Sequence, residues 1–400
     1  MSNNKNNIMI IIPQLTGGGA EKVACNLTFS LNKKYTTYLV TFDENNATYD
    51  YSGTMIPLEV PKSKYNVVRV FNNIIRSYKI LKLKKKLNID LSISFTDTPN
   101  LLNIVTRNKS VAIVSVRHLQ SYFDTGFLRK MVSRITFCRA DKIIALSKMV
   151  EMDLIKNYNT NPQKIKTIYN SCNYEKIGKM AVEDITDEEE IEIFNDGFVL
   201  INCARLIPVK GQWHLIRVFS KLVDEIPNAK LVFLGQGELE ESLKKLVTDL
   251  GLDGKVFFLG FKKNPYKYIA KSDYFLFSSL SEGLGNVLLE SMACGTPIIS
   301  SDCIAGPREI MNPKSINESY NSVDVVFGEY GILVPAFKND DFNAVTPLNF
   351  QELKLFDVLK ECYYNPEIHA KYKNLALKRI LDFSENSIEE DWDKMFKELN

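Results

Sequence analysis

One stretch of the sequence, residues 278–295, combines residue types that bind anions and hydroxyl groups. It reads SSLSEGLGNVLLESMACG and follows a short apolar run at Tyr274–Phe277 that is typical of a buried strand. Gly283 and Gly285 open the turn and let backbone N–H groups approach a ligand, and the helix-favouring residues LLESMA come next. Because a helix directs its positive end at the turn before it, this strand, turn and helix predict an anion site.

Two carboxylates flank the predicted anion site. Glu282 lies in the turn and Glu290 lies eight residues later, which at about 1.5 Å per residue separates them by up to roughly 12 Å. Carboxylates beside an anion site usually bind hydroxyl groups. A nucleotide-sugar, with a sugar on one side of its diphosphate and a ribose on the other, would use both. The alternative is that Glu282 is a charge at a helix N-terminus and Glu290 is a solvated helix residue.

A cationic loop indicates the same chemistry. The apolar run Phe198–Cys203 predicts a strand, and the loop ARLIPVKGQ after it carries Arg205 and Lys210. Arginine offers a planar fork to phosphate oxygens and lysine a mobile point charge, so together they can neutralise a diphosphate leaving group. The alternative is a pair of solvated surface charges. Phe261 and Lys262 lie at the exit of another predicted strand, where a nucleotide base would fit.

The N-terminal region contains a glycine loop. The run Ile8–Pro13 predicts a strand buried on both faces, and it ends in QLTGGGAEK, with Gly17, Gly18 and Gly19, before a helix-like segment. The spacing differs from the G-x-G-x-x-G of dinucleotide-binding loops. The loop is either a tight turn or a second place where the backbone approaches a ligand.

Three further polar residues are expected at the carboxyl edge of the first sheet. Arg117 and His118 follow the predicted strand Val111–Val116, and Asp97 lies in the loop SFTDTPN after the predicted strand Leu91–Phe95. Ligands of open α/β sheets bind at this edge. A lone histidine is usually structural, and Asp97 can equally cap a helix.

The segment SEGLGNVLLESMACGTPII resembles the E-x7-E motif of the retaining glycosyltransferases of family four, which have the two-domain GT-B fold. The loop ARLIPVKGQ resembles the G-R-x-x-x-x-K-G segment of the same family, with Ala204 in place of the usual glycine. A second departure is Asn170-Ser171, where family members often carry Asn-Gly. The resemblance covers most of the chain and is strongest from Phe198 to Glu309.

This resemblance implies a role for each candidate residue. Glu282 would orient the donor sugar, Glu290 would bind the ribose and His118 would contact the far hydroxyls of the sugar, with Glu282 and His118 as the catalytic residues. The other implied contacts are Arg205, Lys210, Gly18, Gly19, Gly285 and Asn286 to the diphosphate, Phe261 and Lys262 to the base, and Gly17, Asp97 and Arg117 to the acceptor. The implied reaction is front-face transfer, in which the departing phosphate helps to take the acceptor proton.

The length of 400 residues suits two domains of about 200 residues each. Apolar runs alternate with helical segments in both halves, which predicts two Rossmann-like, doubly wound α/β domains, and the resemblance implies that they face each other across a cleft. The expected domains are an acceptor-binding domain at 1–180, a nucleotide-sugar domain at 195–382 and a terminal helix at 383–400 that crosses back to the first domain. The acidic stretch EDITDEEEIE is expected to be a linker or peripheral segment.

The net charge of +2 conceals an asymmetry. Residues 1–186 hold 27 Lys and Arg against 14 Asp and Glu, a balance of +13, whereas the remaining residues hold 23 against 34, a balance of −11. Because the first half shows no nucleic-acid motif, its positive charge favours an anionic membrane surface or a phosphorylated acceptor over nucleic acid.

The segment Val67–Leu87 has helical periodicity and allows two interpretations. Its apolar stripe consists of Val67, Phe71, Ile74, Ile75, Tyr78 and Leu81, and it ends in the lysines Lys82, Lys84, Lys85 and Lys86. One interpretation is a core-facing helix whose lysines complement the helix dipole. The other is a basic amphipathic surface for anionic lipid.

Metals, cofactors and disulfides are not expected. Seven cysteines form no C-x-x-C pair and lie mostly in apolar runs, which predicts reduced, buried thiols. Asp391-Trp392-Asp393 spells D-x-D, a metal motif of another glycosyltransferase fold, but it lies in a predicted terminal helix and is interpreted as surface. The apolar runs are far shorter than the about 20 residues that cross a bilayer, and MSNNKNN is not a secretory leader, so a cytoplasmic chain with peripheral membrane contact is expected.

The residues and the resemblance together predict a metal-independent, retaining glycosyltransferase. It would move a hexose or N-acetylhexosamine from a nucleotide-sugar, expected to be a UDP-sugar, to a glycan acceptor. The acceptor would be linked to polyprenyl diphosphate in the assembly of a surface polysaccharide such as capsule or O-antigen. The alternatives are a GT-B phosphorylase or sugar-nucleotide epimerase, an NAD-dependent oxidoreductase, and a catalytically silent binding module.

Overall fold

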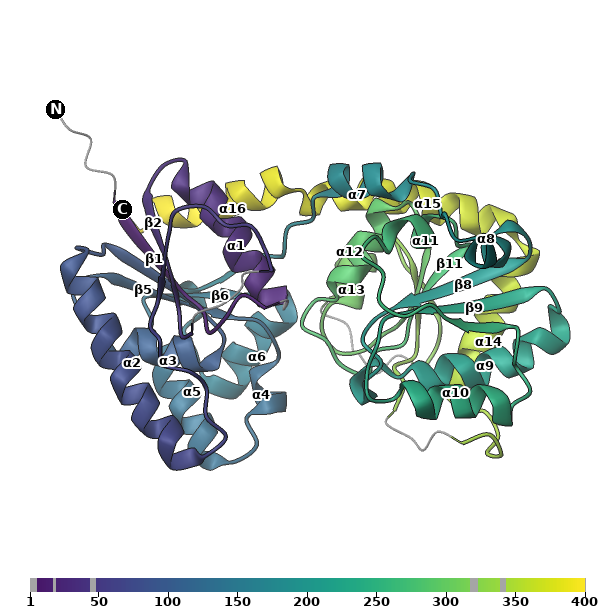
Figure 1. The fold of residues 1–400 in the computed structure, drawn as a ribbon, viewed down its shortest axis with the longest axis horizontal. Helices are drawn as coiled ribbons and strands as arrows, with labels where there is room; N and C mark the ends of the chain where they lie inside the picture. The colour runs from purple at the N-terminus through teal and green to yellow at the C-terminus, as the bar shows by residue number, and fades with distance from the viewer. Residues whose placement is uncertain (1–5, 17–18, 44–47, 317–322, 339–342, 400) are drawn as a thin grey trace. The chain divides into compact units, whose positions relative to one another are not determined.

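The computed structural model describes residues 6–16, 19–43, 48–316, 323–338 and 343–399 of the chain. The chain divides into two compact units, of which the first comprises Met1–Asn170 with Glu389–Asn400 and the second comprises Ser171–Ile388. Each unit is built around a central sheet with helices on both faces (Figure 1). The predicted class, two doubly wound α/β domains, is confirmed.

The sheet of the first unit runs in the order β3-β2-β1-β4-β5-β6-β7, with neighbouring strands parallel. Ile10 of β1 lies opposite Leu39 of β2 and Ile93 of β4, and all three side chains are fully buried. Strands covered on both faces need successive apolar residues, which explains the continuous apolar runs of the sequence. The strands are β1 Asn7–Ile11, β2 Thr36–Thr41, β3 Thr54–Pro57, β4 Leu91–Phe95, β5 Val111–Val116, β6 Lys142–Ala145 and β7 Ile165–Thr167.

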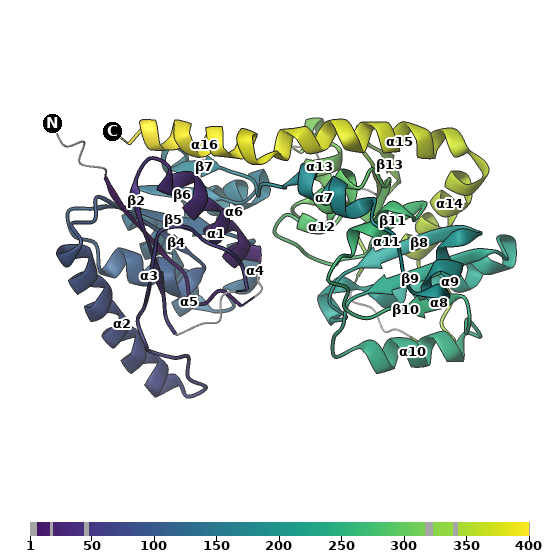
Figure 2. The ribbon, with the colours of Figure 1, turned by 45° about the horizontal axis from the view of Figure 1, so that its top comes forward.

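The helices of the first unit connect these strands (Figures 1 and 2). They are α1 Gly19–Asn32, α2 Asn66–Lys86, α3 Asp97–Val105, α4 Gln120–Phe123, α5 Phe127–Arg139, α6 Lys148–Tyr158 and the 3-10 helix η1 Pro162–Lys164.

The last residues of the chain, within α16 (Glu385–Lys397), belong to the first unit. Lys33 pairs with Glu389 at 3.3 Å, and Lys34 pairs with Asp393. The D-x-D sequence therefore holds the terminal helix in place through Asp393. Its central residue, Trp392, is buried, so the interpretation of the whole motif as surface is wrong.

The sheet of the second unit runs in the order β10-β9-β8-β11-β12-β14-β13, and only the last pair, β14 with β13, is antiparallel within the part of the chain that the structure describes. Its strands are β8 Phe198–Cys203, β9 Ala229–Leu234, β10 Val256–Phe258, β11 Tyr274–Phe277, β12 Ile298–Ser301, β13 Val326–Phe327 and β14 Ile332–Val334. Its helices are α7 Tyr174–Ala181, α8 Glu188–Asn195, η2 Pro208–Lys210, α9 Gln212–Glu225, α10 Glu240–Asp249, α11 Tyr266–Ala270, α12 Asn286–Ala293, α13 Pro307–Met311, η3 Pro313–Ser315, α14 Phe350–Tyr364, α15 Pro366–Arg379 and η4 Ile380–Phe383.

The boundary between the units differs from the sequence expectation. The first unit ends at Asn170, before the expected bound at residue 180, because α7 packs on α11 and α12 of the second unit. The second half of the acidic stretch, residues 188–192, belongs to α8 of the second unit, so a linker is the wrong interpretation for these residues. There Glu190 pairs with Lys262 and accepts a hydrogen bond of 2.7 Å from Tyr268 Oη. Two contacts of one carboxylate fix the acidic segment on the second unit.

Helix α2 is inverted relative to an ordinary surface helix. Its buried residues are Arg76, Ile80 and Lys84, and the predicted apolar stripe is largely exposed, so the core-facing interpretation is wrong. Arg76 donates to Val60 O from Nε at 3.1 Å and from Nη2 at 2.7 Å. Despite this exposed apolar stripe, none of the helices in the described residues is long and apolar enough to cross a membrane.

Lys84 is fully buried, which corrects its placement in the exposed lysine cluster. Its amine donates hydrogen bonds to Asn103 Oδ1 at 2.7 Å and to Asn103 O at 3.2 Å. Asn103 Oδ1 also accepts a hydrogen bond of 2.7 Å from Ser92 Oγ. Burial disfavours the charged amine and lowers the pKa of Lys84 to about 7.

Replacing Lys84 with methionine should remove a pH dependence from the stability of the first unit, so that the parent gains stability relative to the variant as the pH rises from about 7 to 10.5. The folded pKa is about 7, against an ordinary value of 10.5 in the unfolded chain. Between these values the unfolded lysine holds a proton that the folded lysine has released, so the parent gains stability as the pH rises through this window. At about 1.4 kcal/mol per pKa unit, the full difference is a few kcal/mol.

Urea unfolding followed through Trp392 fluorescence measures this difference, in a Trp213→Phe background that leaves a single tryptophan in the chain. Lys82→Met, at an exposed position of the same helix, is the matched control and should show no such pH dependence. Parallel pH profiles for the parent and Lys84→Met would contradict the prediction.

Candidate functional site

The strand order of the second unit creates a switch point between β8 and β11. From β8 the chain continues outwards through β9 and β10, and β11 then adds on the other side of β8. Open α/β sheets bind ligands outside the carboxyl ends of the strands at such a point. Arg205 and Lys210 follow β8, and Glu282 and Gly285 follow β11. The fold therefore brings the two predicted donor loops to the same edge.

Lys210 and Glu282 form an ion pair at this switch point. The Lys210 amine contacts Glu282 Oε1, which also accepts a hydrogen bond of 2.8 Å from Ser279 Oγ. Ser278 Oγ donates to Lys210 O at 2.7 Å, which ties the two loops together. A cation and a carboxylate side by side suit a ligand in which a phosphate is bonded to a hydroxyl-rich sugar.

Two glycines with positive φ shape these loops, and Gly211 allows them to approach each other. Gly211 has φ 60°, and a Cβ there would lie 2.5 Å from Ser278 O. Gly285 has φ 84° and directly precedes α12, and a Cβ there would lie 3.1 Å from Leu288 Cδ1 and 3.3 Å from Phe277 Cζ. A side chain at Gly211 would strain the backbone and push the two loops apart, whereas one at Gly285 would strain the turn and crowd Leu288 of α12 and Phe277 of β11. Asn286 begins α12, so the N-terminus of this helix lies at the predicted anion site.

The other predicted diphosphate and ribose residues lie in the same unit. Arg205 is exposed on the loop after β8, and its carbonyl accepts a hydrogen bond of 3.0 Å from Gln212 Nε2. Glu290 is half-buried on α12. Burial and then the charge of Glu290 raise the pKa of the Cys203 thiol to about 12, so Glu290 lies near the end of β8. Arg205 after β8 and Glu290 on the helix after β11 therefore lie on the two sides of the switch point.

The two predicted base contacts differ in their surroundings. Phe261 is exposed beyond β10. Lys262 pairs with Glu190, and its amine lies 5.5 Å from the centroid of the Tyr268 ring. The Lys262 charge is therefore engaged within the second unit, which leaves the Phe261 ring as the more accessible surface for a base.

The first unit has its own switch point, between β1 and β4. Thr96, at the end of β4, has φ 74°, a conformation that β-branched residues rarely adopt, and it turns the chain into α3. Asp97 begins α3, and its Oδ1 lies 3.8 Å from Nε2 of His118. That nitrogen is buried and has no hydrogen-bond partner among the residues described. The structure thus brings Asp97 and His118 together.

Of the remaining candidate residues in the first unit, the structure describes Gly19 and Arg117. Gly19 is the first residue of α1, whereas Gly17 and Gly18 lie outside the described residues. Arg117 Nη2 donates to Asn170 Oδ1, and Nη1 lies 3.5 Å from Ser115 Oγ. Burial lowers the pKa of Arg117 to about 9, so it is cationic at neutral pH.

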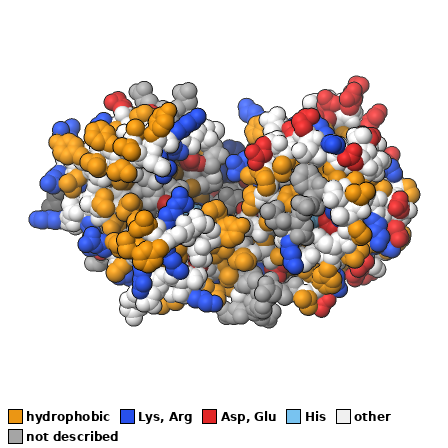
Figure 3. Space-filling model, turned by 90° about the horizontal axis from the view of Figure 1, so that it is seen from below, with side chains coloured by type: hydrophobic (Ala, Val, Ile, Leu, Met, Phe, Trp, Pro, Cys, Tyr) orange, Lys and Arg blue, Asp and Glu red, His pale blue; other side chains and the backbone are white. Residues whose placement is uncertain are grey.

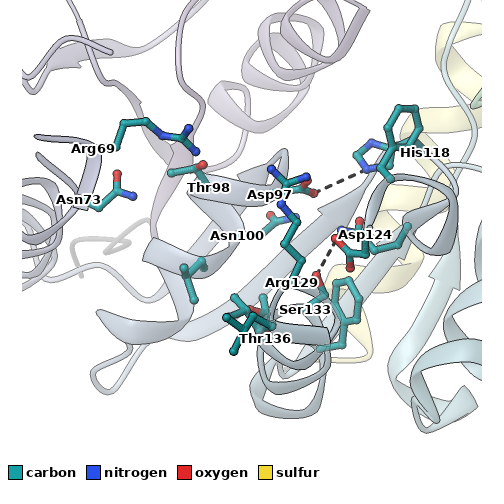
Figure 4. Close-up of a pocket in the computed structure, with 16 residues that line it drawn as sticks. Arg69, Asn73, Asp97, Thr98, Asn100, His118, Asp124, Arg129, Ser133 and Thr136 are labelled. Carbon is teal, nitrogen blue, oxygen red and sulfur yellow. Dashed lines mark hydrogen bonds and ion pairs between the residues drawn. The ribbon is translucent and has the colours of Figure 1, made fainter. Parts of the chain in front are cut away.

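A cavity of about 510 Å³ lies beside Asp97 and His118 in the first unit (Figure 4). Arg69 of α2 and Arg129 of α5 contribute to its lining, and neither pairs with a carboxylate among the described residues. Asp124 lies on the same wall and accepts a hydrogen bond of 2.8 Å from Tyr158 Oη. The cavity combines cations, carboxylates and a histidine, the groups that bind phosphates and sugar hydroxyls.

Sequence reasoning missed Arg69, Arg129 and Asp124. They come from α2, α5 and the end of α4, and no motif marks their spacing. The one available signal was the absence of acidic residues from the α5 sequence FLRKMVSRITFCR. Among the residues that the structure describes, no group of three or more His, Cys, Asp or Glu side chains could hold a metal ion.

Comparisons with known proteins identify the family. The description "Glycosyltransferase Family 4" matches residues 17–176, and "Glycosyl transferases group 1" matches residues 183–322. An uncharacterized glycosyltransferase of Methanocaldococcus jannaschii is 33% identical over 90% of this chain and 92% of its own length. The chain belongs to the family 4 glycosyltransferases. This membership decides against the oxidoreductase alternative.

A second relative of this glycosyltransferase comes from Campylobacter jejuni. It is the N-acetylgalactosamine-N,N'-diacetylbacillosaminyl-diphospho-undecaprenol 4-alpha-N-acetylgalactosaminyltransferase, 30% identical over 96% of this chain and 97% of its own length. Among solved structures, Anabaena HepE in complex with UDP and glucose has a TM-score of 0.74 at 17% identity, covering 98% of this chain and 100% of the HepE chain. The structural likeness confirms the predicted GT-B fold. The roles of the individual site residues stay predictions.

Gly211→Ala should destabilise the second unit of the glycosyltransferase more than Gly251→Ala does. Both glycines have positive φ, at 60° and 66°, but a Cβ at 211 meets Ser278 O at 2.5 Å whereas one at 251 meets nothing within 4 Å. The control should cost about 1–2 kcal/mol for the left-handed backbone, and Gly211→Ala should cost a further few kcal/mol. Urea unfolding followed through Trp213 fluorescence, in a Trp392→Phe background, compares them. Equal losses would show that the Lys210 loop is not held against Ser278.

Proposed function

We propose that this glycosyltransferase moves a hexose or N-acetylhexosamine from a UDP-sugar to a glycan linked to polyprenyl diphosphate, with retention of configuration, in surface polysaccharide assembly at the inner face of the cell membrane. The observation that carries the proposal is the Lys210–Glu282 pair at the switch point beside the start of α12. The Campylobacter jejuni relative, whose name specifies a diphospho-undecaprenol acceptor, and HepE, solved with UDP and glucose, support it.

The donor diphosphate is held by charges of the protein. Lys210, Arg205 and the backbone N–H groups at the start of α12 surround the proposed position of the phosphates. When the bond between the sugar C1 and the phosphate oxygen breaks, its electron pair goes to that oxygen, and fixed cations and dipoles stabilise the developing charge. The acceptor hydroxyl bonds to C1 on the face that the phosphate leaves, and its proton passes to the departing phosphate. Neither step requires a metal ion or a cofactor.

Glu282 changes partner when the donor binds. A diphosphate competes with the Glu282 carboxylate for the Lys210 amine, because two anions then share one cation. The released carboxylate, still held by Ser279 Oγ at 2.8 Å, accepts a hydrogen bond from a hydroxyl of the donor sugar. Glu290 accepts hydrogen bonds from the ribose in the same way. These are the two carboxylates that the sequence spacing predicts.

The acceptor binds in the cavity of the first unit. Arg69 and Arg129 point into this cavity from α2 and α5 (Figure 4) and can pair with a diphosphate, because neither is engaged by a described carboxylate. Asp97, Asp124 and Nε2 of His118, which has no hydrogen-bond partner among the described residues, are suited to glycan hydroxyls. His118 at the far hydroxyls of the donor sugar, and Arg117 at the acceptor, stay predictions from the family resemblance.

Lys210→Ala and Glu290→Ala should each weaken UDP binding. Each substitution removes a charge-assisted contact of about 1.5 to 3 kcal/mol, or roughly 10- to 150-fold in Kd. Isothermal titration calorimetry with UDP measures the change. Lys245→Ala, which alters an exposed lysine of α10, is the matched control and should bind UDP like the parent. Unchanged affinity in both site variants, with intact circular dichroism, would remove the donor-site assignment.

Transfer should persist in excess EDTA. The proposed donor site neutralises the phosphates with Lys210, Arg205 and helix N–H groups, so chelation removes nothing that the reaction needs. Transfer of radiolabelled sugar from UDP-sugars to extracted lipid-linked glycan is compared with and without EDTA. Loss of activity that Mn²⁺ restores would overturn the metal-independent mechanism and leave the glycosyltransferase assignment standing.

A further inference from the structure

The outer face of α2 is apolar along most of its length. Val67, Val70, Phe71, Ile74 and Tyr78 are all exposed and recur at the spacing of a single helix stripe. Phe71 is 61% exposed. The inner face of the same helix packs on the first unit through Ile80, Arg76 and Lys84. The exposed apolar stripe is therefore a second face of α2, separate from the face that packs on the core.

Helix α5 presents a second apolar stripe. Its exposed residues are Phe127, Leu128, Met131, Val132 and Ile135, and Phe127 is 81% exposed. The two helices belong to one surface, because both pack on α3 and both line the cavity that contains Asp97. Arg69, Leu128 and Val132 are at once exposed and part of the cavity lining, so the cavity opens on this surface.

The charged side chains that α2 and α5 themselves carry are all positive, whereas Asp97 and Asp124 lie in the cavity lining. Neither the α2 sequence nor the α5 sequence contains an Asp or a Glu. Lys64, Lys130 and Arg134 are exposed before and along the two stripes. Seen from below, the first unit shows apolar side chains with Lys and Arg among them (Figure 3). A surface that carries both apolar side chains and cations is suited to the interface of an anionic bilayer, where the apolar side chains insert and the cations are attracted to the lipid headgroups. A symmetric pairing of two copies through the same surface would instead bring like charges together.

We infer that α2 and α5 form a docking face that inserts its apolar side chains into the headgroup region of an anionic lipid bilayer. This inference rests on the proposed function in one respect: the cavity that opens on this face is the one assigned to the lipid-linked acceptor. Docking brings the cavity to the depth of the acceptor diphosphate, while the polyprenyl chain stays in the bilayer. The face itself is defined by exposure and charge, independently of the reaction.

Vesicle co-sedimentation of the full chain tests the face. The parent should bind phosphatidylcholine vesicles that contain phosphatidylglycerol, and bind pure phosphatidylcholine vesicles far less. Binding should fall as salt shortens the screening length from about 10 Å at 0.1 M towards about 3 Å at 1 M. Phe71→Ser with Phe127→Ser should weaken binding about tenfold or more, because two inserted aromatic side chains are lost. Phe350→Ser with Tyr364→Ser, a pair of exposed aromatics of the second unit, is the matched control and should bind like the parent.

The charge contribution is tested separately. Lys64→Gln, Lys130→Gln and Arg134→Gln combined should reduce binding to anionic vesicles by about tenfold or more. Its control is Lys245→Gln, Lys263→Gln and Lys271→Gln, three exposed lysines of the second unit, which should change binding little. Circular dichroism and UDP affinity, measured on every variant, should match the parent.

The outcomes separate docking from catalysis. Weakened vesicle binding with unchanged UDP affinity supports the docking face. Vesicle binding that is equal in the parent and both face variants, or absent in the parent, overturns it and leaves the donor site and the reaction untouched. Loss of a parent dimer in Phe71→Ser with Phe127→Ser, measured by sedimentation equilibrium, would also overturn it, because the face would then join two copies of the chain. Failure of UDP binding in the parent would overturn the proposed function alone.

Discussion

The second unit depends on one electrostatic arrangement, a lysine and a carboxylate held together at the carboxyl ends of two adjacent strands. Lys210 and Glu282 meet because β8 and β11 are neighbours in the sheet, although β9 and β10 lie between them in the chain. The loops must then approach so closely that Gly211 leaves no room for a Cβ beside Ser278 O. The strand order and the glycine at position 211 together bring these two charges into contact.

The first unit is organised by a different constraint, a helix with its polar residues inside. The Arg76 guanidinium lies 4.2 Å from the centroid of the Phe42 ring and donates to Val60 O, and the Lys84 amine donates to Asn103. Buried polar groups are tolerated only when they are hydrogen-bonded, and these contacts supply the required partners. Ile80 contributes to the core beside these two polar residues, whereas the apolar residues on the opposite side of α2, such as Phe71 and Tyr78, are left at the surface.

Much of the fold was predictable from the sequence, for a physical reason. Central strands of a parallel sheet are buried on both faces and need uninterrupted apolar residues, as at Ile10 and Leu200. The missed strands β3 and β13 are short and lie at sheet edges, where this requirement is relaxed. The orientation of α2 was not predictable, since periodicity shows that one face is apolar but not which way it points. That direction is set by tertiary contacts of Arg76 and Lys84.

The candidate site was predictable to a smaller extent. The motif placed Lys210 and Glu282 in two loops of the chain, but their contact follows only from the order of the strands. Arg69 and Arg129 are 60 residues apart in the sequence, on helices that meet through α3, and no local pattern joins them. The pairing of Lys262 with Glu190 was missed because the acidic segment was interpreted as a linker or peripheral segment rather than as a packed part of the second unit.

The charge distribution places a last constraint on donor binding. Residues 187–400, most of which belong to the second unit, carry a balance of −11, so an anionic nucleotide gains no general attraction to this part of the chain. Some of these acids are already neutralised by cations, as Glu352 is by Arg217 at 2.9 Å. Exposed charges beyond a screening length of about 8 Å at physiological salt contribute little. Contact groups at the switch point must therefore supply the binding energy, and the Lys210 amine, held ready by Glu282, is the group in the position to do so.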